Sequence, residues 1–173
     1  MTIHATLAKR RRAISLALTV ACLLTWSLAS WARPNGAVPY PTGYRNWTHV
    51  KSSLIGPKHP SFERDGGFHH IYANEKALEG YRAGKFPDGA VLVDDGLVLK
   101  ETENGAVVEG ARRRIAVMLK DSQRYAETGG WGYEVFKGDS QTERTGTAEV
   151  VAKCFACHGQ QKEHDSVFSQ FRK

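Results

Sequence analysis

The chain has 173 residues, of which 41% are hydrophobic, 24% charged and 10% aromatic, as in an ordinary globular protein. This composition excludes a disordered, fibrous or multi-span membrane protein. The net charge of +6 comes mostly from residues 1–32, which hold four basic residues and no acidic one. The remainder carries 20 basic against 18 acidic residues with no basic stripe, so the charge gives no argument for nucleic-acid binding.

The N-terminus has the order of a secretory signal peptide. A basic segment at 9–12 precedes an apolar run at 13–24, and Ser30-Trp31-Ala32 places small residues before a cleavage site. Cleavage three residues earlier, retention as a membrane anchor and lipidation of the cysteine in this segment are the alternatives. We therefore expect residues 33–173 to be exported to the periplasm as a single domain, free of the membrane after signal removal.

The mature chain predicts an α+β fold dominated by an antiparallel sheet. Turn signals such as Glu103-Asn104-Gly105 join strand-like segments that are neighbours in sequence, which favours antiparallel pairing. Asn74 and Thr147 suit helix N-caps, and Gly84 suits the position after a helix. About five strands are expected, at 47–55, 68–73, 90–93 continuing at 97–99, 106–109 continuing at 114–119, and 131–136. Short helices are expected at 75–83, at 122–127, from the Thr147 cap through His158, and at 165–172, with an extended arm at 33–46 and a loop at 57–67.

The strongest motif is Cys154-Phe155-Ala156-Cys157-His158, the attachment pattern of c-type haem. On a helix, positions i, i+3 and i+4 share a face, so two thiols can add to the two vinyl groups on one porphyrin edge. The adjacent His158 then ligates the iron. A redox dithiol, or half of a zinc site with His164, is the alternative interpretation. The motif predicts one covalent haem c carried by the C-terminal helix.

A sixth protein ligand to the iron would have to come from one methionine or from several histidines. Met118 stands on an expected strand, where core packing is the more common role of methionine. His69 and His70 point to opposite faces of their strand, so at most one of them faces the haem. The full set of candidates is Met118, His49, His59, His69, His70 and His164. With no clear sixth ligand among them, we expect an open iron that binds a small diatomic molecule.

Two further groups of side chains are candidates for the haem pocket. Four aromatic residues could cap it, although ordinary core packing is the commoner role of each: Phe62, Phe68, Tyr72 and Phe86. The basic run at 112–114 could neutralise the haem propionates or lie at a solvated strand end.

The order of short motifs along the chain resembles the cytochrome P-460 family, which includes cytochrome c′-beta. The resemblance covers nearly the whole mature chain and is carried by WTHVK (47–51), IYAN (71–74), FPDGAVLV (86–93), KDSQRY (120–125), GWGYE (130–134) and CFACHG (154–159). It implies a mainly antiparallel β fold, a five-coordinate haem c with His158 as proximal ligand, and a homodimer. Members of the family oxidise hydroxylamine, often with nitric oxide as intermediate or product, or bind nitric oxide without turnover.

Three positions that carry the chemistry of the enzymatic branch differ in this chain. The resemblance implies that the enzymatic branch has a porphyrin-linked lysine where this chain has Asp94. It likewise implies a glutamate at the position of Ala116 and a pocket arginine at the position of His69. Hydroxylamine oxidation removes protons as well as electrons and needs a positioned base, so Asp94 and His69 become the catalytic candidates. Lys100 would reach the haem only if residues 94–96 bulged the strand.

These observations lead to one hypothesis with two alternatives. The first is an exported mono-haem c protein that binds a small ligand such as nitric oxide and exchanges electrons with a partner protein. The alternatives are a hydroxylamine-oxidising enzyme of the same family and a six-coordinate electron-transfer cytochrome.

Overall fold

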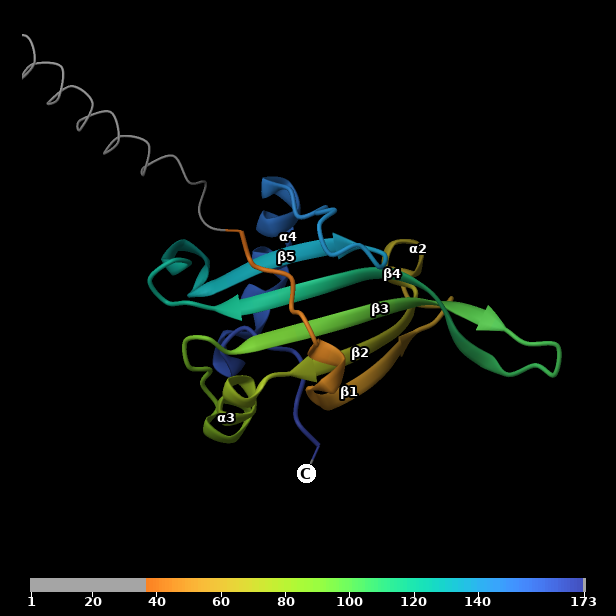
Figure 1. Ribbon diagram of the computed structural model, residues 1–173, viewed down its shortest axis with the longest axis horizontal. Helices are drawn as coiled ribbons and strands as arrows, with labels where there is room; N and C mark the ends of the chain where they lie inside the picture. The colour runs from red at the N-terminus through yellow and green to blue at the C-terminus, as the bar shows by residue number, and fades with distance from the viewer. Residues whose placement is uncertain (1–36, 173) are drawn as a thin grey trace, which may run out of the picture. The chain divides into compact units, whose positions relative to one another are not determined.

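The computed structural model describes residues 37–172, which contain one five-stranded antiparallel sheet (Figure 1). Each strand pairs only with its neighbours in sequence, in the order β1-β2-β3-β4-β5. The strands are β1 (Thr48–Ile55), β2 (Gly67–Ala73), β3 (Val91–Glu101), β4 (Val107–Lys120) and β5 (Trp131–Lys137). The sheet and its short helices confirm the predicted α+β class. The expected signal peptide lies outside the described residues.

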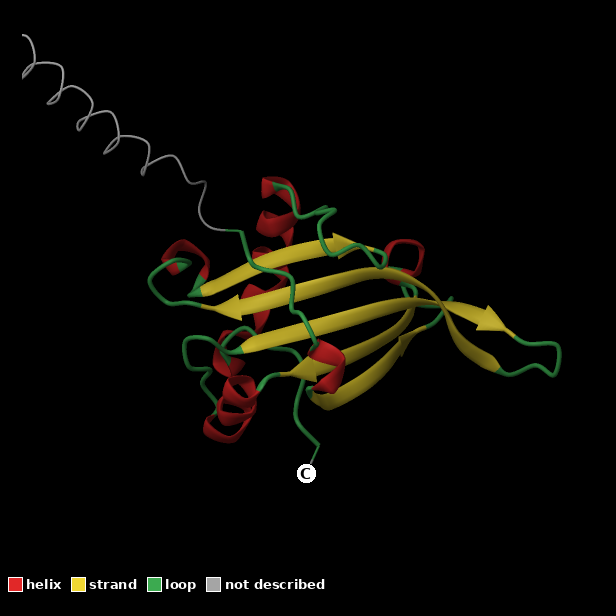
Figure 2. Cartoon of the chain, viewed as in Figure 1, coloured by secondary structure: helices red, strands yellow, loops and turns green. Residues whose placement is uncertain are grey.

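The helices are short and precede, connect or follow the strands (Figure 2). They are η2 (Tyr44–Asn46), α2 (Phe62–Asp65), α3 (Glu75–Ala83), η3 (Ala126–Thr128), α4 (Ala148–His158) and η4 (Gly159–His164). The Asn74 side chain accepts a hydrogen bond from the Ala77 backbone at the start of α3, and Gly84 ends this helix in the left-handed region. Thr147 caps α4 in the same way, so both predicted caps are confirmed.

Strands β3 and β4 are each continuous where the sequence predicted interruptions. The expected break at Asp94-Asp95-Gly96 is absent, because both carboxylates have partners within the sheet: Asp94 bonds to His69 and Asp95 to Arg112. The irregularity is confined to shifts of register after Gly96. The two strands together form a long hairpin that extends beyond the other strands (Figure 1).

Two predicted helices are wrong, and three short helical segments were missed. Residues 122–125 form turns and only Ala126–Thr128 is helical, as a 3-10 turn. The segment 165–172 has no helix, because Asp165 and Ser166 both adopt positive φ, at 50° and 65°. The missed segments are α2 within the expected loop at 57–67, η2 at the end of the arm expected to be extended, and η4 directly after α4.

The two faces of the sheet bury different clusters. On one face the N-terminal arm, with Val38 and Tyr44, covers Val93, Ile115 and Phe136. On the other face a second cluster joins strand residues to α3, to α4 and to the segment after it: Val50, Ala73, Ala77, Leu78, Phe86, Ala90, Leu92, Met118, Trp131, Tyr133 and Val167. Figure 1 shows the arm crossing one face while α4 lies on the other. The helix with the cysteine motif therefore lies against the second face.

Candidate functional site

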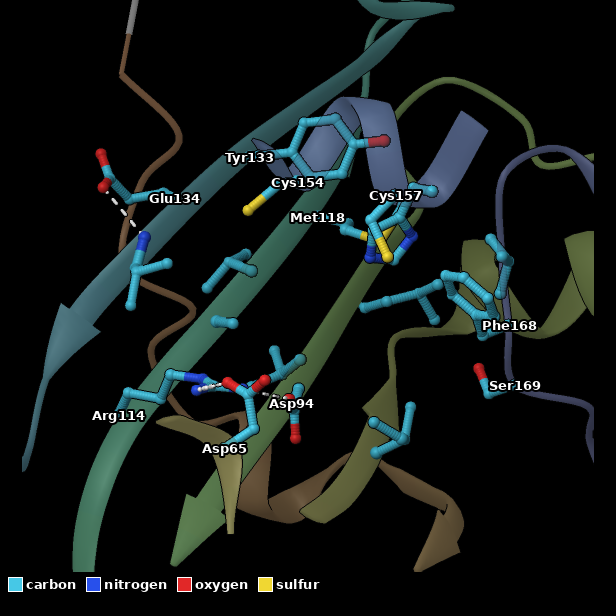
Figure 3. A pocket seen from close by; sticks show the side chains of 18 of the residues that line it. Asp65, Asp94, Arg114, Met118, Tyr133, Glu134, Cys154, Cys157, Phe168 and Ser169 are labelled. Atoms are coloured by element: carbon cyan, nitrogen blue, oxygen red, sulfur yellow. Dashed lines mark hydrogen bonds and ion pairs between the residues drawn. The ribbon is translucent and has the colours of Figure 1, made fainter. Parts of the chain in front are cut away.

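A cavity of about 850 Å³ lies between the second face of the sheet and α4 (Figure 3). This volume is in the range of cofactor pockets. Three consecutive residues of each of β3, β4 and β5 line it, at 92–94, 116–118 and 133–135, and the outer two of each set lie on the second face of the sheet. The strand residues on this wall include Ile71, Leu92, Asp94, Ala116, Met118, Tyr133 and Val135, and α4 with the following segment adds Cys154, Cys157, His158, Val167 and Phe168.

Both cysteines of the motif line this cavity from successive turns of α4. Neither forms a disulfide among the residues that the structure describes; Cys154 is half-buried and Cys157 exposed. Burial raises the pKa of the Cys154 thiol, with neighbouring charges as smaller influences. Two free thiols, one helical turn apart and facing one cavity, are in the arrangement that two thioether bonds to one porphyrin edge require.

The imidazole of His158 is oriented by the segment that follows α4. Its Nδ1 lies 2.8 Å from the Ser166 carbonyl oxygen, and because a carbonyl only accepts, Nδ1 carries the proton. Burial lowers the pKa of His158, which favours the neutral ring. The rings of Tyr133 and Phe168 contact it at centroid distances of 5.4 and 5.1 Å. Nε2 is therefore left unprotonated, which is the state in which imidazole binds a metal.

The opposite end of the cavity is polar. Figure 3 shows Asp65, Asp94 and Arg114 at the far end from the two cysteines. His69 stands behind Asp94, with its Nδ1 3.0 Å from each carboxylate oxygen and its Nε2 2.7 Å from the Asp65 carbonyl oxygen. Because the carbonyl needs Nε2 as donor, a second proton on Nδ1 gives the best contact with the Asp94 carboxylate. The hydrogen bond to Asp94 raises the pKa of His69, against the opposing effect of burial.

Arg114 completes this polar end by bridging two carboxylates. Its guanidinium donates to Asp65 at 2.8 Å and lies 3.6 Å from Asp94. The other two arginines of the run do not line the cavity: Arg112 binds Asp95, and Arg113 donates to backbone carbonyls next to α2. Of the predicted propionate partners, only Arg114 therefore lines the cavity, and it is already paired.

The three positions that differ from the enzymatic branch of the family lie together. Asp94 is the direct cross-strand partner of Ala116 on one side and of Ile71 on the other. His69 is on the same face as Asp94 and bonds to it, whereas His70 points to the other face. Sequence alternation predicted that at most one of the two histidines could face the haem; the structure puts His69 on the side of the sheet that carries the cavity, but His69 itself does not line the cavity.

The other predicted pocket residues are placed differently. Met118 lines the cavity but is packed in the hydrophobic cluster, 9% exposed. None of the histidine candidates for a sixth ligand lines the cavity: His49, His59, His69, His70 and His164. The four proposed aromatic caps are also absent from its wall: Phe62, Phe68, Tyr72 and Phe86. Tyr133 and Phe168, which the sequence analysis missed, are the aromatic residues there, and Lys100 is exposed on the hairpin.

These features fit a c-type haem. The cavity has a suitable size, a mostly apolar wall, two thiols one turn apart and an imidazole with a free Nε2. The Tyr133 hydroxyl is also buried without a hydrogen-bond partner in the part of the chain that the structure describes, so a polar group is left for a bound molecule or water to satisfy. The site is therefore that of a protein with one covalently attached haem c.

The profile of the cytochrome P460 family matches residues 41–169, and the chain belongs to this family. A comparison with curated proteins gave no match. Cytochrome P460 proteins bind haem c covalently, and Cys154 and Cys157 on α4 supply the matching pattern. Among residues 37–172, no helix has the length and apolar content needed to cross a bilayer. The protein is thus a mono-haem c-type cytochrome.

Proposed function

We propose that this cytochrome binds a small ligand such as nitric oxide at a five-coordinate haem and exchanges electrons with a partner protein. Cys154 and Cys157 are the covalent anchors, and His158 is the axial ligand. The observation that carries the proposal is the hydrogen bond from His158 Nδ1 to the Ser166 carbonyl, which leaves Nε2 available directly after Cys157 and one turn from Cys154. When bound, the haem supplies an iron that coordinates a small ligand and accepts or donates an electron.

The composition of the cavity wall supports an open coordination position. Among the candidate sixth ligands, Met118 alone lines the cavity. Both ring nitrogens of His69 are hydrogen-bonded, one to the Asp94 carboxylate and one to the Asp65 carbonyl. Met118 packs against the hydrophobic cluster of the second face, as a core methionine does. A wall of aliphatic and aromatic side chains favours a neutral diatomic ligand over a charged one.

The pair of His69 and Asp94 favours hydroxylamine oxidation as the second candidate function. Asp94 faces the cavity with its side chain 25% exposed, and His69 behind it is hydrogen-bonded to its carboxylate. A carboxylate in this position accepts hydrogen bonds from the N–H and O–H groups of hydroxylamine and can take up a proton that it loses. Nitric oxide carries no such proton, so Asp94 and His69 would contribute little to its binding.

Spectroscopy and turnover separate these functions. Protein matured in a host with cytochrome assembly should give a five-coordinate high-spin ferrous spectrum that changes when nitric oxide is added. A low-spin spectrum that is indifferent to ligand would instead support a six-coordinate electron carrier. A strongly red-shifted Soret band, or turnover of hydroxylamine with an artificial acceptor that is lost in Asp94→Ala and His69→Ala but kept in His164→Ala, would support the enzyme. His164 is exposed on η4 and serves as the matched control.

The anchor residues have their own test. Cys154→Ser should leave the haem on a single thioether and weaken the haem stain after denaturing electrophoresis. His158→Ala should abolish the normal ferrous spectrum, and an unaltered spectrum would mean that another residue binds the iron.

We also propose that residues 1–32 are a signal peptide, that 33–173 is a single haem c domain, and that the protein is a periplasmic homodimer. The order of basic, apolar and small residues supports export, and the likeness to cytochrome P-460 proteins supports the dimer. Mass spectrometry of the exported protein should give a chain that begins at Arg33 with one haem added. Sedimentation equilibrium should give twice that mass, and a monomer at micromolar concentration would contradict the dimer.

A further inference from the structure

The loop after η4 is held in an uncommon backbone conformation. Asp165 and Ser166 are the two non-glycine residues with positive φ between positions 37 and 172. A left-handed conformation costs free energy for a residue with a side chain, so it persists where surrounding contacts enforce it. At this loop those contacts come from segments that are distant in sequence.

The side chain and carbonyl of Asp165 are bound on three sides. Its carboxylate accepts from Lys120 Nζ at 2.7 Å and from the Phe86 backbone N–H at 2.8 Å. Its carbonyl accepts from the indole Nε1 of Trp131 at 2.8 Å. Each partner stands within a different motif of the family resemblance: FPDG, KDSQRY and GWGYE. The three motifs therefore converge on one residue outside all of them.

Lys120 is an unusual partner because its side chain is only 7% exposed. It also donates to the Gly129 carbonyl and lies over the Trp131 ring, 4.9 Å from its centroid. Burying an ion pair is expensive and is weak evidence for a role in stability alone. An ion pair in this position does, however, define where the backbone of the Asp165 loop lies.

The next residue connects this clamp to the haem site. The carbonyl of Ser166 is the acceptor for His158 Nδ1 at 2.8 Å. We infer that Asp165, through its buried ion pair with Lys120, is a positioning residue that holds this carbonyl against His158 and so sets the strength of His158 as an iron ligand. The inference rests on the proposed role of His158. A firm Nδ1–H···O contact makes imidazole a stronger donor, which favours ferric over ferrous iron.

Two substitutions and their combination test this inference in the haem-loaded protein. Asp165→Asn removes the charge but keeps the shape, and asparagine tolerates the left-handed region. Lys120→Gln removes the cation but keeps a donor for Asp165. Glu143→Gln is the matched control, because it breaks the exposed Lys137–Glu143 ion pair, which has the same 2.7 Å separation.

The readouts are the reduction potential and the iron–histidine stretching band of the ferrous protein in resonance Raman spectra. We expect Asp165→Asn and Lys120→Gln each to shift the potential upward and the stretching frequency downward. The double variant should shift no further than the larger single shift, because both changes break the same interaction. Glu143→Gln should match the wild type.

Wild-type values in a folded, haem-loaded Asp165→Asn protein would overturn the inference, as would fully additive shifts in the double variant. If Asp165→Asn fails to fold, Lys120→Gln alone decides, and the absence of a shift there has the same meaning. Failure of the proposed function is distinguishable: the iron–histidine band would then persist in His158→Ala. A band that is lost in His158→Ala but unchanged in Asp165→Asn refutes only the positioning role.

Discussion

Asp95 stands on the face of β3 opposite the cavity and is fully buried. Its carboxylate accepts from Arg112 Nε at 2.6 Å, from the Tyr44 hydroxyl at 2.7 Å and from Arg45 at 2.9 Å. This cluster attaches the N-terminal arm to the strand that carries Asp94 on its other face. We predict that Asp95→Asn destabilises the protein, because two buried donors lose their charged acceptor.

The magnitude follows from the exposure of the partners. Removing one member of a buried ion pair costs about 3–5 kcal/mol. Arg45 is 55% exposed and can be solvated by water, and Arg112 keeps a second partner in Asp139. The expected loss is therefore at the lower end, about 3 kcal/mol, or about 10 °C in Tm for a domain of this size.

Urea denaturation of the haem-loaded protein, followed by circular dichroism, measures this loss. Asp139→Asn is the control, since it removes the exposed partner of the same Arg112 and should cost less than about 0.5 kcal/mol. A loss below about 1 kcal/mol for Asp95→Asn, or equal losses for both variants, would refute the assignment of Asp95 as a buried structural anion.

The same cluster predicts a dependence on pH. Burial by itself would raise the pKa of Asp95, but the hydrogen bonds from Arg112, Tyr44 and Arg45 outweigh it and lower the pKa below 3.8. A carboxyl group whose pKa is lower in the folded than in the unfolded protein stabilises the fold at pH values above its unfolded-state pKa. This contribution is lost as the pH falls through its folded-state pKa. The difference in the free energy of unfolding between wild type and Asp95→Asn should be largest at pH 7 and should decrease below about pH 4.

Three further predictions concern a strand histidine, a helix cap and the cavity wall. The pKa of His69 is raised, mainly by its hydrogen bond to Asp94. Its contribution to stability is therefore present below pH 6.5 and is lost as the pH rises through its folded-state pKa. In urea denaturation, His69→Gln should lower the free energy of unfolding more at about pH 6 than at about pH 9. Asn74→Ala removes an acceptor for two backbone N–H groups and should lower the free energy of unfolding by about 1–2 kcal/mol in urea, and an unchanged midpoint would contradict the cap. Tyr133→Phe removes a buried hydroxyl without a partner in the described residues and should cost less than about 1 kcal/mol by the same assay; a larger loss would show that the bound haem or a water satisfies it.

The elements that the sequence predicts well are those defined by local chemistry. Asn74 and Thr147 begin helices and Gly84 ends one because caps and left-handed turns depend on a few adjacent residues. The hairpin at Glu103-Asn104-Gly105 forms for the same reason. Each of these predictions needed no knowledge of a distant partner.

The errors arose where distant partners decide the outcome. Asp94 and Asp95 indicated a turn by composition, but charges from other strands allow both to remain within β3. Asp165 favoured the start of a helix, but contacts from Lys120 and Trp131 hold it in a left-handed loop. Alternation placed His69 and His70 on opposite faces, yet only the packing of α4 determines which face is lined by the cavity.

The candidate site was predicted in its covalent part and missed in its surroundings. A run of five residues gives the Cys154 and Cys157 anchors with His158 directly, because their spacing on one helix carries the chemistry. Tyr133 and Phe168 had no comparable signal, since aromatic residues are common in any core. The available indication was that Tyr133 and Trp131 are two residues apart on one strand and therefore lie on the same face of the sheet.

The strictly sequential pairing of the sheet separates two parts of the architecture. Every strand hydrogen-bonds to the strand before it in sequence, so the five-stranded ladder is complete at β5. Both thiols lie outside this ladder on α4, which packs against the second face together with Val167. The register of the sheet and the attachment point of the haem therefore depend on different contacts.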